Sequence, residues 1–153
     1  MAIFFFDSNA IVKYYVIEPG SIWVRNLVDT NGNIGLVCEV SIAEVAAALS
    51  QIQRGKRFGR TFMQDAYRRF RSDLRNARLI SHPADWKTLE LAAELAMRHP
   101  LKGCDAIQVA SAIIAEQTVG RKLIFISGDL QALRAATGEG LAIDDPFKHI
   151  DNK

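Results

Sequence analysis

Cysteine and histidine are scarce in this sequence of 153 residues. Cys38 and Cys104 are too few and too isolated for a disulfide framework or a zinc site. The three histidines are scattered along the chain. Two of them, His82 and His99, precede a proline, which indicates loop or helix-end positions rather than metal ligands.

Long apolar runs are also missing, and none approaches the length of a membrane span. The apolar run AIFFF at 2–6 is interrupted by Asp7, and no basic stretch precedes it, which argues against a signal peptide. We therefore expect a cytoplasmic protein that does not bind a membrane. The chain has no internal repeat and no linker rich in proline or glycine, so we expect residues 1–153 to form one domain.

Net charge is small, at +2, but its distribution is uneven. Residues 54–78, here called the basic segment, contain nine basic and two acidic side chains, so the other residues have ten basic and fifteen acidic ones. Such a chain can attract a polyanion to one region and hold cations in another. The arginines form either a phosphate-binding surface or an ordinary solvated helix face, and the sequence leaves both interpretations open. The aromatic residues between them are expected to face the core.

Strand and helix patterns alternate along the chain. Short apolar runs predict strands, and apolar residues at helical spacing with flanking caps or glycine predict helices. The predicted strands are 2–6, 34–38, 78–81, 123–127 and 141–144. The predicted helices are 41–53, about 60–77, 85–98, 105–117 and 129–136. This alternation predicts an α/β fold with a mostly parallel sheet covered on both faces.

Four acidic residues lie where a predicted strand ends or a predicted helix begins: Asp7, Glu44, Asp105 and Asp129. Taken singly, each has a simple structural interpretation. An aspartate after a strand can cap the next helix, Ser41 and Glu44 have the spacing of a capping box, and an acid in a first turn complements the helix dipole.

Taken together, the four acids have a second interpretation. The carboxyl ends of parallel strands share one edge of a sheet, where ligands bind in α/β folds. Four carboxylates that converge there would repel one another until a proton or a cation relieved the repulsion. Mg²⁺ prefers such oxygen ligands. Glu39, Asp144 and Asp145 also follow predicted strands and are interpreted as acids at the loop edge, in water.

Four segments, in this order, resemble those of PIN-domain proteins. FFFDSNAIVKYYVIEPGS resembles the first strand and helix of the family, and SIAEVAAAL resembles the helix that carries its glutamate. LKGCDAIQVASA and FISGDLQAL are similar to its third and fourth acidic segments. The ordered set covers nearly the whole chain. Within the family, the length and the continuation KYYVIEPGS are most similar to the VapC toxins of bacterial and archaeal toxin–antitoxin pairs.

The resemblance implies a three-layer α/β/α sandwich whose mostly parallel sheet has about four to five strands. It also implies a catalytic metal site formed by Asp7, Glu44, Asp105 and Asp129, with Asn9 and Ser127 in support. Ser127-Gly128 stands where a Thr-Ala type pair is common in the family, and it keeps the hydroxyl group.

The resemblance further implies an endoribonuclease that depends on Mg²⁺ or Mn²⁺, in which an activated water attacks an RNA phosphodiester. The implied partners are RNA, a small VapB-like antitoxin and a second copy of the chain. RNA-binding candidates in the basic segment are Arg54, Lys56, Arg57 and Arg60.

Alternative functions stay open at this point. The chain can be a PIN nuclease that is not a toxin, or a catalytically silent PIN module that binds RNA or a protein. A haloacid-dehalogenase-type phosphotransferase usually needs a second aspartate two positions after the first, where this sequence has Asn9. A receiver domain would need adjacent acids early in the chain and a lysine after a late strand, and neither pattern is clear here.

Overall fold

The computed structural model describes residues 1–150. Strands and helices alternate over most of this length, as the sequence predicts. The strands are β1 (Ile3–Phe6), β2 (Ile34–Cys38), β3 (Leu79–His82), β4 (Ile124–Ile126) and β5 (Ala142–Asp144). The helices are α1 (Ser8–Tyr15), α2 (Ser21–Asp29), α3 (Ser41–Arg54), α4 (Arg60–Arg75), α5 (Trp86–Arg98), α6 (Gly103–Val119), α7 (Leu130–Gly138) and the 3₁₀ helix η1 (Pro146–His149).

All five predicted strands form one sheet in the order β3-β2-β1-β4-β5, and every pair of neighbours is parallel. The central strand β1 pairs with β2 through Phe5 and Leu36, and with β4 through Phe5 and Phe125. Because the strands run in the same direction, their carboxyl ends lie along one edge. Asp7 and Ser127 follow directly after two adjacent strands and therefore meet there.

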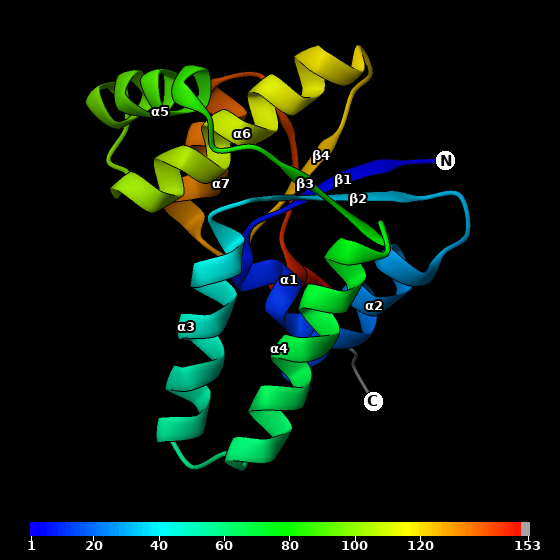
Figure 1. Cartoon of the computed structure of the whole chain (residues 1–153). Helices are drawn as coiled ribbons and strands as arrows, with labels where there is room; N and C mark the ends of the chain where they lie inside the picture. The colour runs from blue at the N-terminus through cyan, green and yellow to red at the C-terminus, as the bar shows by residue number, and fades with distance from the viewer. Residues whose placement is uncertain (151–153) are drawn as a thin grey trace.

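Helices cover both faces of the sheet, so the three-layer α/β/α prediction is confirmed (Figure 1). Side chains of β1 alternate between the two faces. Ile3 and Phe5 belong to the core under α5, α6 and α7, whereas Phe4 and Phe6 belong to the core under α1, α2, α3 and α4. This double burial explains why the first strand is a continuous apolar run instead of an alternating one.

The helices α3 and α4 form a hairpin that extends away from the sheet, with residues 55–59 at its far end (Figure 1). The basic segment therefore begins at the tip of this hairpin and returns along α4 toward the sheet. The sequence did not predict α2, which follows Gly20 in a left-handed conformation (φ 87°) and has no side-chain cap. Without a capping side chain, that helix has no start signal in the sequence.

Within residues 1–150, no helix combines the length and the apolar character that a transmembrane segment requires.

Candidate active site

Asp7 lies at the carboxyl end of β1 and is 3% exposed. It is the N-cap of α1, as the structural interpretation predicts, and its Oδ1 accepts from the Ser8 amide at 2.6 Å. Its Oδ2 accepts from Ser127 Oγ at 2.8 Å and from Asn9 Nδ2 at 3.0 Å. Both oxygens are thus held by protein donors, and Oδ1 keeps a lone pair for a further contact.

Burial raises the pKa of Asp7 to about 7, because the charged form is poorly solvated there. Hydrogen bonds from Ser127 and Ser8 oppose this shift, while the negative charges of Glu44 and Asp105 add to it. The charges of those two acids therefore act on Asp7, although they come from distant parts of the sequence. An ordinary helix cap on the surface has no such perturbation, so the capping role alone does not account for Asp7.

Glu44 belongs to a buried hydrogen-bond network, and the predicted capping box is wrong. The N-cap of α3 is Val40, and no side chain caps the helix. Ser41 Oγ instead lies 2.8 Å from Ser8 Oγ. Glu44 Oε1 accepts from Ser8 Oγ at 2.9 Å and from Gln108 Nε2 at 2.7 Å. These polar groups form hydrogen bonds with one another where α1, α3 and α6 meet. The Ser41 hydroxyl takes part in this network and does not cap α3.

Sequence reasoning missed Gln108. It is fully buried on α6, one turn after Asp105, and its amide donates to Glu44, Ser8 and Ser41. Its Oε1 has no hydrogen-bond partner among the described residues. The signal in the sequence was a glutamine within the mostly apolar stretch 106–115, three positions after Asp105 and on the same helix face.

Asp105 and Asp129 approach the same edge from α6 and α7. Asp105 is half-buried in the first turn of α6, as predicted. Burial raises its pKa, the charges of Asp129 and Glu44 raise it further, and Lys102 opposes them. Asp129 is the N-cap of α7, and its Oδ1 accepts from the Ala132 amide at 2.9 Å. Asp105 is thus within electrostatic reach of the other three predicted acids.

Asn9 and Ser127 join the loop after β4 to the start of α1. Asn9 Oδ1 accepts from the Gly128 amide at 2.8 Å, and its Nδ2 donates to Ser127 Oγ at 3.2 Å. Ser127 Oγ also accepts from the Asp129 amide at 3.1 Å. These contacts fix the positions of Asp7 and Asp129 relative to each other.

The donor set suits a hard divalent cation, because it consists of carboxylate oxygens that repel one another. Asp105 makes no side-chain hydrogen bond within residues 1–150, and Glu44 and Asp129 each use only one oxygen there. However, no three His, Cys, Asp or Glu side chains in that range are close enough to hold an ion as they stand. A divalent cation held by these carboxylates would reach some of them through water, as is usual for Mg²⁺.

The other acids that follow strands were predicted to lie in water, and this prediction fails for one of them. Glu39 is exposed and accepts from the Ala84 amide at 3.1 Å. Asp145 is 6% exposed, and it is the N-cap of η1 through the Phe147 amide at 2.9 Å. The prediction that Asp145 lies in water is therefore wrong, because the 3₁₀ helix after β5 folds back over it.

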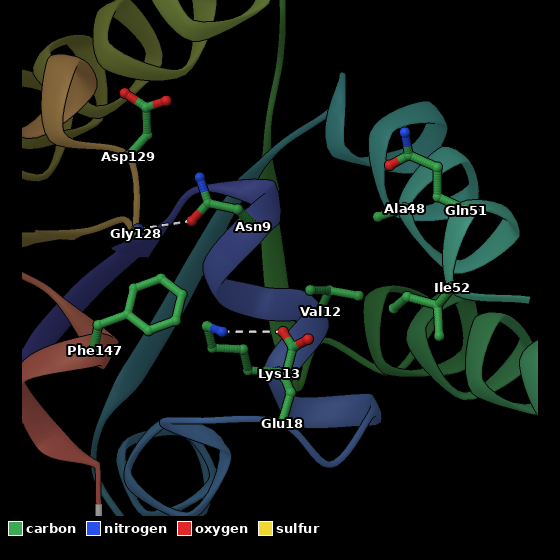
Figure 2. Close-up of a pocket in the computed structure, with 10 residues that line it drawn as sticks. All are labelled: Asn9, Val12, Lys13, Glu18, Ala48, Gln51, Ile52, Gly128, Asp129 and Phe147. Carbon is green, nitrogen blue, oxygen red and sulfur yellow. Dashed lines mark hydrogen bonds and ion pairs between the residues drawn. The ribbon is translucent and has the colours of Figure 1, made fainter. Parts of the chain in front are cut away.

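A groove of about 410 Å³ opens beside the acidic residues (Figure 2). One wall comes from α1 and α3, and the other from the Gly128–Asp129 loop and η1. Its polar lining residues are Asn9, Lys13, Glu18, Gln51 and Asp129, and Phe147 stands at its edge.

The four RNA-binding candidates are all exposed on or beside the α3–α4 loop. Arg57 reaches the groove, because its Nη2 donates to the Ile17 carbonyl at 3.0 Å and lies 3.8 Å from Glu18 Oε2. Arg54 ends α3 and donates to Ser50 Oγ at 2.9 Å, and Arg60 begins α4. The aromatic residues of the segment do not all face the core as predicted: Phe70 is buried, but Phe62 is exposed and stacks on Phe58.

A sequence model of the PIN domain matches residues 4–136. A comparison with curated proteins finds no match. Among solved structures, VapBC2 from Rickettsia felis, bound to a DNA fragment from its promoter, is 14% identical with a TM-score of 0.62, over 94% of this chain and 98% of that one. PAE2754 from Pyrobaculum aerophilum is 18% identical with a TM-score of 0.62, over 97% of this chain and 86% of that one.

VapC20 from Mycobacterium tuberculosis, a toxin that cleaves the sarcin-ricin loop, is 14% identical with a TM-score of 0.62. The match covers 91% of this chain and 96% of that one. At such identities the likeness concerns the fold.

Proposed function

This chain belongs to the PIN domain family, and from that premise we propose that it is an endoribonuclease that depends on Mg²⁺ or Mn²⁺. We propose further that it is the toxin of a type II toxin–antitoxin pair. One observation carries the nuclease proposal: a buried aspartate, Asp7, lies under the field of like charges at the edge of a parallel sheet. The ionised form of Asp7 is costly in this position, and a bound cation would offset that cost.

Asp7, Glu44, Asp105 and Asp129 would hold the cation, directly or through water. A divalent metal bound there supplies a Lewis acid that activates water and neutralises charge on the scissile phosphate. The chain's own residues orient the carboxylates: Ser127 and Asn9 fix Asp7, while Ser8 and Gln108 fix Glu44.

The substrate class is proposed from the charge distribution. A phosphate backbone is attracted to the basic segment, where Arg54, Lys56, Arg57 and Arg60 lie on the surface. The toxin assignment has support from structural neighbours that include VapBC complexes. A small VapB-like antitoxin and a second copy of the chain are the proposed protein partners.

The substitution Asp7→Asn tests the nuclease proposal. We expect RNA cleavage in MgCl₂ to fall about 1,000-fold, because a metal site supplies several kcal/mol of transition-state stabilisation. The matched control is Asp65→Asn, which removes an exposed acid that pairs with Arg68 on α4 and should leave cleavage unchanged. Mapping of RNA ends gives the chemistry: attack by water leaves a 5′-phosphate and a 3′-hydroxyl.

Two results would contradict the proposal. A 2′,3′-cyclic phosphate end would show that the RNA 2′-hydroxyl is the nucleophile. Cleavage that is equal in wild type and Asp7→Asn would separate the activity from the acidic site. Growth arrest on induced expression of the wild type, and not of Asp7→Asn, tests the toxin role separately.

A further inference from the structure

Phe147 stands at the edge of the groove that the acidic site shares. Its side chain is 48% exposed, although Pro146 directly before it in η1 is buried. Figure 2 shows the ring pointing toward Asn9 and the head group of Lys13. Single exposed apolar side chains are common on protein surfaces, and what distinguishes this one is that its ring lines the groove beside Asp129.

The 3₁₀ helix that carries Phe147 is fixed at both ends. At its start, Pro146 packs so closely on Gly20 that a Cβ built on the glycine would lie 2.6 Å from the Pro146 carbonyl oxygen. At its end, the ring of His149 stacks on Trp23 with centroids 4.0 Å apart and an interplanar angle of 4°. Phe147 is therefore held in place by its neighbours in the chain rather than by burial of its own ring.

Gly128 makes room for the ring beside the acidic residues. A Cβ built on Gly128 would lie 2.7 Å from Cε2 of Phe147 and 3.5 Å from Oδ1 of Asn9. Any larger residue at this position would push the ring away from the loop that carries Asp129. The Ser-Gly pair of this chain thus has a structural consequence: it places an aromatic ring next to a predicted metal ligand.

A cluster with an excess positive charge lies on the other side of the ring. Lys13 is 3% exposed, and its Nζ lies 4.3 Å from the Phe147 ring centroid and 3.0 Å from Glu18 Oε1. Arg57 approaches the second oxygen of Glu18 at 3.8 Å. Two cations share one anion, so the cluster has a net charge of +1 beside the groove.

We propose that this groove binds one nucleotide of single-stranded RNA next to the scissile phosphate. The base stacks on the exposed part of Phe147, and a flanking phosphate lies near Arg57, whose side chain is half exposed. The buried charge of Lys13 acts from behind the ring. This inference rests on the proposed ribonuclease function and names the part of the chain that selects the nucleotide. An aromatic platform beside a cationic group is the usual combination for an unpaired base and its phosphate. The net positive charge of the cluster complements that phosphate.

The test is the affinity for short fluorescent RNA oligonucleotides, measured by anisotropy in EDTA, where cleavage is absent. Base stacking on an aromatic side chain is typically worth about 1–3 kcal/mol, so Phe147→Ala should weaken binding about 10-fold or more. Phe147→Trp should retain affinity, because it keeps a stacking surface. Trp86→Ala is the control: it removes another exposed aromatic side chain, at the start of α5 and outside both the groove and the basic segment, and should change affinity little. Thermal melting of each variant checks that the fold is kept.

Cleavage in MgCl₂ separates this inference from the function on which it rests. Phe147→Ala should cut at a broader set of sites and have a higher KM, with the metal affinity unchanged. If the wild type binds RNA through Phe147 but does not cut it, the nuclease proposal is overturned and the nucleotide site is kept. If the wild type cuts RNA, and Phe147→Ala has the same affinity and the same cleavage sites, the nucleotide site alone is overturned. Loss of affinity in Trp86→Ala instead of Phe147→Ala would also overturn it. So would an unchanged RNA affinity of Phe147→Ala together with lost binding of a protein partner.

Discussion

The acidic site and the basic segment both gather side chains of one charge, but the chain holds them in different ways. Asp7 and Glu44 are each held by at least two hydrogen bonds from side chains that come from other elements. In the basic segment, Arg68 is exposed and pairs only with Asp65 one turn away on α4. Asp7 and Glu44 are therefore fixed in position by contacts away from solvent. In the basic segment, the side chains of Lys56, Arg60 and Arg75 are exposed and make no hydrogen bond or ion pair within residues 1–150.

Fixed and mobile charges have different electrostatic effects. Fixed like charges in a poorly solvated site cost stability and can orient a cation or waters. Mobile charges in water cost little and attract a polyanion over a distance, with an effect that salt screens. Substitution in the acidic site should therefore change stability and chemistry sharply, whereas substitution in the basic segment should change affinity gradually.

The largest stability effect that we expect is the pH dependence caused by Asp7. Its pKa is about 7 in the folded chain against an ordinary value of 3.8, so the folded state favours the protonated form. The contribution of Asp7 to the free energy of unfolding of the metal-free chain is therefore fully present below about pH 4 and is lost as the pH rises to about 7. A difference of about three pKa units corresponds to about 4 kcal/mol. Urea unfolding in EDTA over this pH range measures it.

Two comparisons show whether Asp7 is the cause. Asp7→Asn should flatten most of the pH dependence, while Asp65→Asn should leave it intact. MgCl₂ should raise the melting temperature of the wild type more at pH 8 than at pH 5, because the cation binds the ionised form. A pH profile that is the same in wild type and Asp7→Asn would contradict the assignment.

Gln108→Leu should have the next largest effect. It removes the amide that donates to Glu44 and to two buried serine hydroxyls, which should cost about 1–3 kcal/mol of unfolding free energy. It also frees Glu44, so RNA cleavage should fall as well. Urea unfolding and a cleavage assay measure both effects. Gln117→Leu, on the exposed face of the same helix, is the control, and a Gln108→Leu variant more stable than wild type would refute the anchoring role.

The sequence predicted the positions of the acidic residues better than the hydrogen bonds that hold Glu44. Asp7 could be placed because it directly follows β1, and Asp129 because it comes three residues after the end of β4; the position of a strand end follows from the apolar run itself. Gln108 could not be placed, because its partners lie on α1 and α3, and the periodicity of one helix says nothing about its neighbours. Ser41 was misassigned for the same reason: its spacing to Glu44 fits a cap, but tertiary contacts compete for its hydroxyl.

The groove beside the site was the least predictable part. The position of Phe147 depends on contacts of η1 with Gly20 and Trp23, more than a hundred residues earlier in the chain. A 3₁₀ turn of four residues has no periodicity to detect, and an exposed phenylalanine looks like any other in the sequence. The strands, in contrast, were predicted to within two residues, because burial on both faces gives an unbroken apolar run.

The smallest effect concerns a single arginine of the basic segment. Arg60→Gln should weaken RNA binding only about two- to fivefold and lower the slope of log affinity against log salt by about 1, because one phosphate contact releases about one counterion. Arg68→Gln is the control on the same helix: its guanidinium pairs with Asp65 at 3.0 Å, so its removal also frees a carboxylate and should change the slope less. Equal slopes for the two variants would mean that total charge matters rather than position. An RNA affinity that does not depend on salt would show that the charges of the basic segment do not bind RNA. The difference between this segment and the acidic site would then have no functional role.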